Sequence, residues 1–190
     1  EVDHIDENPV RVHVTLTIDG DEALVDFAGS TNQVDAGINS PLPFSKAAAY
    51  VAIRMMFRNP TPNCEGFYRP ISVCAPASSI LNPTLPAPCG ARGITGFRAI
   101  DAVLGALAQA APERVPADGD GGNTNITIGG RDKHGRPFAF ADWICGSRGG
   151  RPDGDGPEGV VHPGANMTNT PVEIAELGAP VMIEEYEMVP

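Results

Sequence analysis

The sequence is short of positive charge. Only 13 lysines and arginines stand against 24 aspartates and glutamates in 190 residues, which gives a formal net charge of −11. Binding to a nucleic-acid backbone requires a basic face, and no cluster of Lys or Arg supplies one. We therefore expect no nucleic-acid partner and interpret the acidic balance as a solvated surface.

Long apolar runs are also lacking. No stretch approaches the roughly 18 consecutive apolar residues that suggest a membrane-spanning helix, and no secretory signal peptide is visible. The four cysteines form no C-x-x-C pair. We expect no membrane association and free thiols in a reducing, cytoplasmic environment.

Two common signatures of catalysis and binding are missing. No G-x-x-x-x-G-K-[ST] phosphate loop is present, and the Gly-rich run 119–123 carries Asp120 where such a loop needs lysine. The four histidines form no H-E-x-x-H motif or other ligand pair. We expect this chain alone to bind neither ATP nor a metal ion.

Glycine (22) and proline (19) are plentiful, which predicts many turns and loops. Between them, apolar and polar residues alternate over 10–18 and continue over 23–27, a pattern typical of a β-hairpin. The pattern of the later chain predicts a second hairpin, a short strand and a final strand. These elements cover residues 123–128 with 138–144, 71–75 and 181–189.

Two helices are predicted. Residues 44–57 are apolar around the whole helix, which favours burial. Residues 97–111 carry apolar side chains at helical spacing, with Thr95 as the expected N-cap and Pro112 as the stop. The sequence therefore predicts a single α+β domain over 1–190, with antiparallel hairpins and a mixed sheet packed against two main helices, joined by Gly/Pro-rich loops.

Two polar residues attract attention because of their setting. Asp142 lies between Phe140 and Trp143, where a buried carboxylate would suit proton transfer; the alternative is a solvent-facing strand residue. His162 lies in the Gly/Pro-rich segment 145–166, and loops on a rigid scaffold often carry function.

Several motifs resemble a known family. They are VDFAGS (25–30), GINSP (37–41), the long stretch DAVLGALAQAAPERVPA (101–117), NTPVE (169–173) and EYEMVP (185–190). In this order they resemble the middle-to-late part of the hydantoinase B/oxoprolinase family. The resemblance spans nearly the whole chain, which corresponds to roughly a third of a family member and so is expected to be a fragment.

The resemblance implies an ATP-dependent enzyme acting on a small cyclic amide. Relatives include N-methylhydantoinase, 5-oxoprolinase, caprolactamase and the alpha subunits of acetone and acetophenone carboxylases. A companion hydantoinase A-type subunit or domain binds ATP and phosphorylates the substrate carbonyl oxygen, and the B-type part acts on the activated species. ATP and a divalent metal are thus expected only in the complete, oligomeric enzyme, and the isolated chain is expected to be inactive.

The same hypothesis assigns roles to individual residues. Asp142, where many relatives carry Glu, and Glu173 are expected to move protons. Donors for a developing oxyanion are expected at four positions: Asn123, Asn125, Asn169 and Thr170. Three further residues are expected to bind substrate: Asn39, Arg92 and His162.

The sequence leaves two alternatives open. One is an alpha-type subunit of a carboxylase related to acetone or acetophenone carboxylase. The other is a non-catalytic assembly domain that docks the ATPase partner through the apolar helix 44–57.

Overall fold

The computed structural model confirms the α+β class, with four α-helices, a mixed sheet and separate hairpins among the residues it describes. The described ranges are 3–5, 8–58, 60–120, 124–144, 146, 148–165 and 169–187. None of the helices within these ranges is long and apolar enough to cross a membrane.

The first sheet has three strands. β3 (Thr15–Asp19) and β4 (Glu22–Asp26) form the predicted antiparallel hairpin, and β5 (Ile71–Cys74) pairs with β4 in parallel. Gly20 closes the hairpin with a φ of 59°, a conformation that glycine adopts without steric cost. The predicted hairpin and the short predicted strand are thus confirmed.

The predicted strand over 10–18 is broken. Its first part belongs to a separate hairpin of β1 (Asp3–Ile5) and β2 (Asn8–Val10), and residues 11–14 form no strand. The backbone N–H groups of Arg11 and His13 instead donate to the hydroxyls of Thr31 and Ser30. These local bonds replace a sheet ladder.

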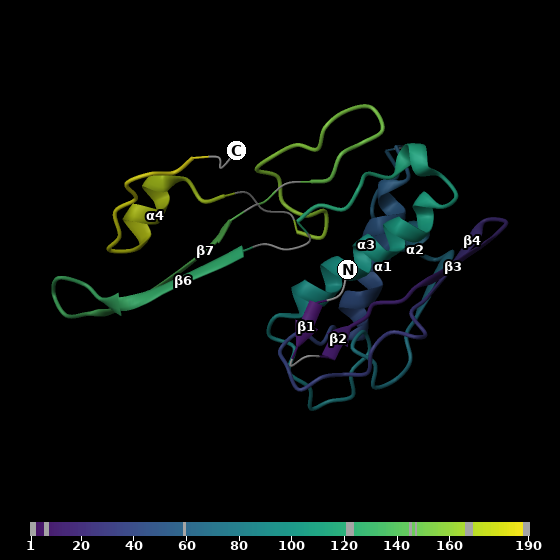
Figure 1. The fold of residues 1–190 in the computed structure, drawn as a ribbon, viewed down its shortest axis with the longest axis horizontal. Helices are drawn as coiled ribbons and strands as arrows, with labels where there is room; N and C mark the ends of the chain where they lie inside the picture. The colour runs from purple at the N-terminus through teal and green to yellow at the C-terminus, as the bar shows by residue number, and fades with distance from the viewer. Residues whose placement is uncertain are drawn as a thin grey trace.

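Two long helices pack together (Figure 1). α1 (Leu42–Met55) and α3 (Arg92–Ala108) each bury one stripe of small and aliphatic side chains. At Gly96 a Cβ atom would lie 2.1 Å from the Phe44 ring, so the contact requires glycine. α1 is buried on this face only, whereas its sequence had suggested burial all round.

The limits predicted for the second helix are partly wrong. α3 begins at Arg92, so Thr95 lies inside the helix and is buried, and Ala91 precedes the first turn without a side-chain cap. The helix ends at Ala108, and a 3₁₀ turn, η1 (Pro112–Arg114), follows. Helix packing at Gly96 outweighs the low helix propensity of glycine that marks this segment as a boundary.

The core lies between the helices and the first sheet. Its largest fully buried side chains come from four different parts of the chain, including the Pro-rich connector 76–88. They are Val25, Phe27, Ile80, Leu81, Ile100 and Val103. The connector enters the core because Ile80 forms backbone hydrogen bonds with Thr31 and Ser40.

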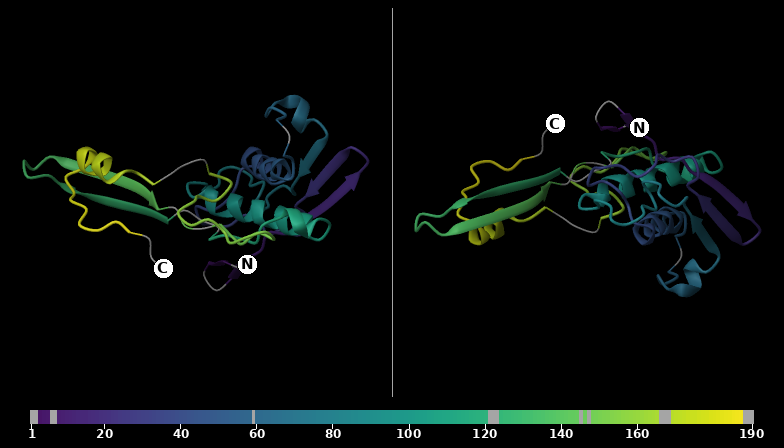
Figure 2. Two further views of the ribbon diagram at one scale, coloured as in Figure 1. Left: turned by 90° about the horizontal axis from the view of Figure 1, so that it is seen from above. Right: turned by 90° about the horizontal axis from the view of Figure 1, so that it is seen from below.

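The later chain extends to one side of the helix pair. β6 (Thr124–Arg131) and β7 (Pro137–Ile144) form the second predicted hairpin, and α4 (Val172–Gly178) lies beside it (Figures 1 and 2). A short helix, α2 (Glu65–Tyr68), precedes β5. Between β7 and α4, the described residues of the predicted loop form neither helix nor strand.

The prediction for the final segment is wrong in two respects. α4 was not expected, although Pro171 precedes it and Glu173 lies in its first turn, both ordinary signals of a helix start. Residues 181–187 form no strand. The Ile183 N–H donates instead to the Glu176 side chain, so a contact with α4 takes the place of strand pairing.

Candidate functional site

A buried histidine and aspartate join the loop 148–165 to α3. The imidazole Nε2 of His162 lies 3.0 Å from Oδ1 of Asp101, and the two side chains are 2% and 8% exposed. The Gly164 backbone N–H donates to Nδ1 at 3.1 Å. Because Nδ1 accepts this bond, the proton of a neutral imidazole lies on Nε2 and is donated to Asp101.

Both ring nitrogens of His162 are therefore engaged by the protein. The imidazole also stacks on Phe97, with 4.8 Å between ring centroids, and Arg98 lies 3.3 Å from Oδ2 of Asp101. A Cβ atom at Gly164 would lie 2.6 Å from Phe97 and Ile100, so the loop approaches the helix closely. This arrangement makes His162 a fastening for the loop, whereas the sequence had suggested a direct contact with substrate.

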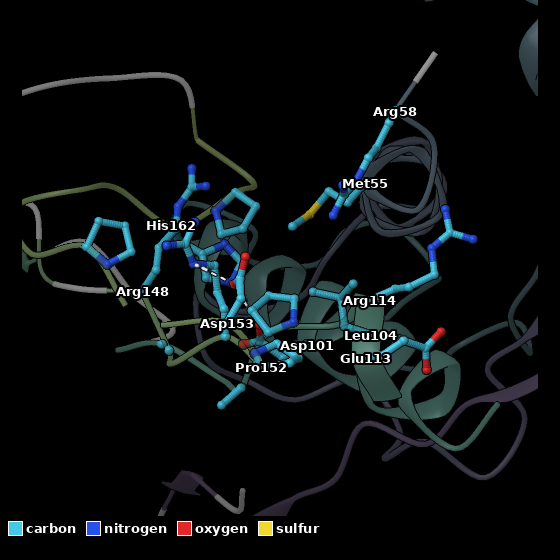
Figure 3. A pocket seen from close by; sticks show the side chains of 17 residues that line it. Met55, Arg58, Asp101, Leu104, Glu113, Arg114, Arg148, Pro152, Asp153 and His162 are labelled. Atoms are coloured by element: carbon cyan, nitrogen blue, oxygen red, sulfur yellow. Dashed lines mark hydrogen bonds and ion pairs between the residues drawn. The ribbon is translucent and has the colours of Figure 1, made fainter. Parts of the chain in front are cut away.

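A cavity of about 360 Å³ opens beside this pair (Figure 3). Its walls come from the end of α1, from α3, from η1 and from the loop that carries His162. We call it the arginine cavity after the four arginines that line it. They are Arg58, Arg114, Arg148 and Arg151.

A second hollow, of about 930 Å³, lies between the start of α3 and the β6–β7 hairpin. We call it the hairpin cleft. The Arg92 guanidinium carbon lies 5.5 Å from the centroid of the Phe44 ring at one wall, and Asn125 and Trp143 line the other. The structure thus brings together two residues predicted for the site, Arg92 and Asn125.

Two more predicted residues meet on the hairpin. The Thr170 hydroxyl donates to Oδ1 of Asp142 at 2.7 Å, and both residues are half-buried. Cross-strand pairing of Asp142 with Ile126, and of Trp143 with Asn125, places the two pairs on opposite faces of the hairpin. Asp142 with Thr170 and Arg92 with Asn125 therefore form two separate constellations.

The remaining predicted residues are not gathered at either hollow. Glu173 is exposed in the first turn of α4, Asn169 is half-buried just before that helix, and Asn123 lies outside the described residues. Asn39 is fully buried. Its amide donates to the Val34 and Pro88 carbonyls at 2.7 and 2.8 Å and accepts the Val34 N–H at 2.9 Å, so the predicted substrate contact is replaced by a structural role.

Asp101 was missed by sequence reasoning, although a signal for it exists. It follows Phe97 by one helical turn and precedes Leu104 by another, so it lies on the apolar stripe of α3. A carboxylate in that position must find a partner when it is buried. The arginines of the cavity carry no such signal, because only the fold brings α1, η1 and the late loop together.

The side chains that commonly bind metals are dispersed. Within the described ranges, no group of three or more His, Cys, Asp or Glu side chains is arranged to hold a metal ion. These residues do not fit a metal site, and we derive no reaction step through a metal. ATP and a divalent metal remain predictions for the complete enzyme.

Comparison with known proteins identifies the family. The sequence profile of the hydantoinase B/oxoprolinase family matches residues 1–190. The chain belongs to this family. A Pseudomonas sp. (strain NS671) protein, whose name assigns it provisionally as the B component of a D-/L-hydantoinase, is 33% identical over 186 residues, covering 94% of this chain and 31% of that protein.

Further relatives agree. Arabidopsis thaliana 5-oxoprolinase 1 is 30% identical over 98% of this chain and 14% of its own length. The crystal structure of ATP-dependent caprolactamase from Pseudomonas jessenii is 30% identical with a TM-score of 0.79, covering 92% of this chain and 31% of that one. Acetone carboxylase, at 16% identity and a TM-score of 0.76 (89% and 24% covered), shares the fold. The chain described here thus spans 31% or less of the length of each of these relatives.

Proposed function

We propose that this chain is part of the ring-opening B-type subunit of an ATP-dependent cyclic-amide hydrolase that works with a companion ATPase. One observation carries the proposal: the likeness to ATP-dependent caprolactamase, with 30% identity and a TM-score of 0.79 over 92% of the chain. A shared scaffold at this identity supports related chemistry, whereas fold alone would not.

The chemistry explains the need for ATP. Amide resonance deactivates the carbonyl carbon of a lactam or hydantoin toward water. Phosphorylation of the carbonyl oxygen by the companion removes that resonance and provides a leaving group. The B-type part then guides water to the activated carbon, the ring C–N bond breaks, and phosphate is released.

Within this chain, Asp142 is the proposed proton acceptor. The Thr170 hydroxyl and the Trp143 backbone N–H both donate to its Oδ1, at 2.7 and 2.8 Å, which fixes the orientation of the carboxylate. A positioned carboxylate of this kind can take a proton from attacking water. Glu173, exposed on α4, is the second candidate for that role.

The hairpin cleft is the proposed place of the ring. Trp143 contributes an apolar surface to its wall, while Asn125 and Arg92 offer amide and guanidinium donors. Apolar walls with a few convergent polar groups are typical of small-molecule sites. The two faces of the hairpin then hold different parts of the reaction, binding on one and proton transfer on the other.

The test is a substrate panel on the complete protein with its companion ATPase and ATP. We expect ring-opened amino acid from a lactam or a hydantoin. ATP-dependent carboxylation of a ketone without lactam opening would assign the protein to the carboxylase alternative and overturn the proposal.

A second function, docking of the ATPase, is favoured by one observation. The outward side of α1 carries Tyr50 and Val51, which with the nearby Phe57 and Tyr68 line a hollow of about 670 Å³. Exposed apolar patches often mark interaction sites. Tyr50→Ser with Phe57→Ser would then abolish co-purification with the ATPase, whereas a purely catalytic role for the chain predicts normal assembly.

A further inference from the structure

The arginine cavity is basic in a chain that is otherwise acidic. Four of the 13 lysines and arginines line it, against three of the 24 acidic residues. Cation-rich lining inside an acidic protein costs stability through mutual repulsion unless an anion compensates it. The local charge therefore indicates a ligand rather than a solvated surface.

The carboxylates in the cavity leave much of this charge unopposed. Asp101 is already matched by Arg98, from outside the cavity, and by His162. Asp153 lies 3.8 Å from Arg151, but the two side chains are 80% and 56% exposed, so the pair is weak and screened. Glu113 is the remaining acid.

Three arginines face that single acid. In the described part of the chain, no carboxylate lies within 4.0 Å of Arg58, Arg114 or Arg148 to form an ion pair. Figure 3 shows Arg148 beside His162 on one side of the cavity, with Arg114 and Arg58 on the other. The positive charge thus flanks the cavity.

Two of these arginines are held in place by the backbone. Nε of Arg148 donates to the Val161 carbonyl at 3.1 Å, and the Arg114 guanidinium donates to the Met56 carbonyl. A guanidinium carries five N–H donors, so one anchoring bond orders the side chain and leaves donors for a ligand. Val161 precedes His162, so the His162–Asp101 contact also positions Arg148.

We propose that the arginine cavity binds a small molecule through a tetrahedral oxyanion, a phosphate or phosphoryl group. Arginine is the side chain best suited to such groups because its planar donors bind two oxygens at once. A volume of about 360 Å³ lies within the range of small-molecule sites. The inference does not require that a cyclic amide is the substrate.

The test measures the affinity of the complete protein for inorganic phosphate by titration calorimetry at low ionic strength. We expect binding, and we expect Arg148→Met to weaken it by about 10- to 100-fold, the effect of losing one charge-assisted hydrogen bond. Arg69→Met, an exposed arginine outside the cavity, is the matched control and should bind as the unaltered protein does. Sulfate should compete, whereas acetate should not.

A folding defect in Arg148→Met would leave Arg58→Met as the decisive variant, because Arg58 is exposed at the cavity edge. Absence of phosphate binding, unchanged binding in both cavity variants, or displacement by equimolar acetate would each overturn the proposal. The assay needs neither ATP nor the companion. Its failure would therefore leave the ring-opening proposal standing, and a failure of ring opening would leave the anion site standing.

Discussion

Removal of the His162 side chain should release the loop 148–165 from α3. His162→Ala loses a hydrogen bond to a carboxylate, worth about 1.5–3 kcal/mol, and a ring stack on Phe97, worth about 0.5–1.5 kcal/mol. Asp101 keeps its contact with Arg98, which limits the penalty of leaving a buried charge. We expect the free energy of local loop opening to fall by about 3 kcal/mol.

Hydrogen exchange in the complete protein measures this directly. Local opening sets the exchange rate of protected amides, so about 3 kcal/mol corresponds to exchange roughly 100-fold faster. The Gly164 and Ala165 amides report on it, because they donate to Nδ1 and to the carbonyl of residue 162. His134→Ala, at an exposed turn, is the control and should leave these amides unchanged.

A second variant separates the two hydrogen bonds of the ring. His162→Gln keeps an N–H donor for Asp101 but removes the acceptor for Gly164, so exchange should be intermediate. If the loop amides of His162→Ala exchanged at the rate of the unaltered protein, the buried pair would not be what holds the loop.

Two other changes test the fold. Gly96→Ala should lower the free energy of unfolding by about 1–3 kcal/mol, because the added Cβ would meet the Phe44 ring, whereas Gly105→Ala, with open space around it, should be neutral or stabilising in the same thermal melt. The backbone N–H of Arg136, with its guanidinium and the His134 N–H, holds the pKa of Asp132 below its ordinary value, so NMR should show that carboxyl titrating at lower pH than an unstructured Asp. A folded-state pKa that is lowered stabilises the hairpin turn at neutral pH, and acidification through that pKa should remove the contribution. A midpoint at or above about 3.9 would contradict it.

The sequence predicted the elements whose pattern is local. Alternation between Leu16 and Val25 found the first hairpin, and the turn 131–135 found the second. Errors arose where distant contacts decide the outcome. The start of α3 depends on how Gly96 packs on Phe44, and residues 11–14 bond to side chains at 30 and 31 rather than to a strand.

The candidate site was predictable only in part. Thr170 and Asp142 were both expected at the site and do meet, although nothing in the sequence indicates a pairing across 28 positions. Asn39 was expected there from a motif but closes a loop instead, since a buried amide can satisfy several carbonyls at once. The arginine cavity gathers side chains from four segments, so only the fold reveals it.

If this chain takes part in ring opening rather than in assembly alone, loss of the Asp142 carboxylate should separate ATP consumption from product formation. The decisive quantity is the ratio of ring-opened product to ATP consumed by the complete enzyme carrying Asp142→Asn, with Asp142→Glu and the exposed Asp19→Asn as comparisons. We predict that Asp142→Asn lowers product turnover by about 10²–10⁴-fold while ATP consumption persists, and that the Glu variant keeps substantial activity. Full coupled turnover in Asp142→Asn would remove Asp142 from the reaction and leave Glu173 as the candidate for proton transfer.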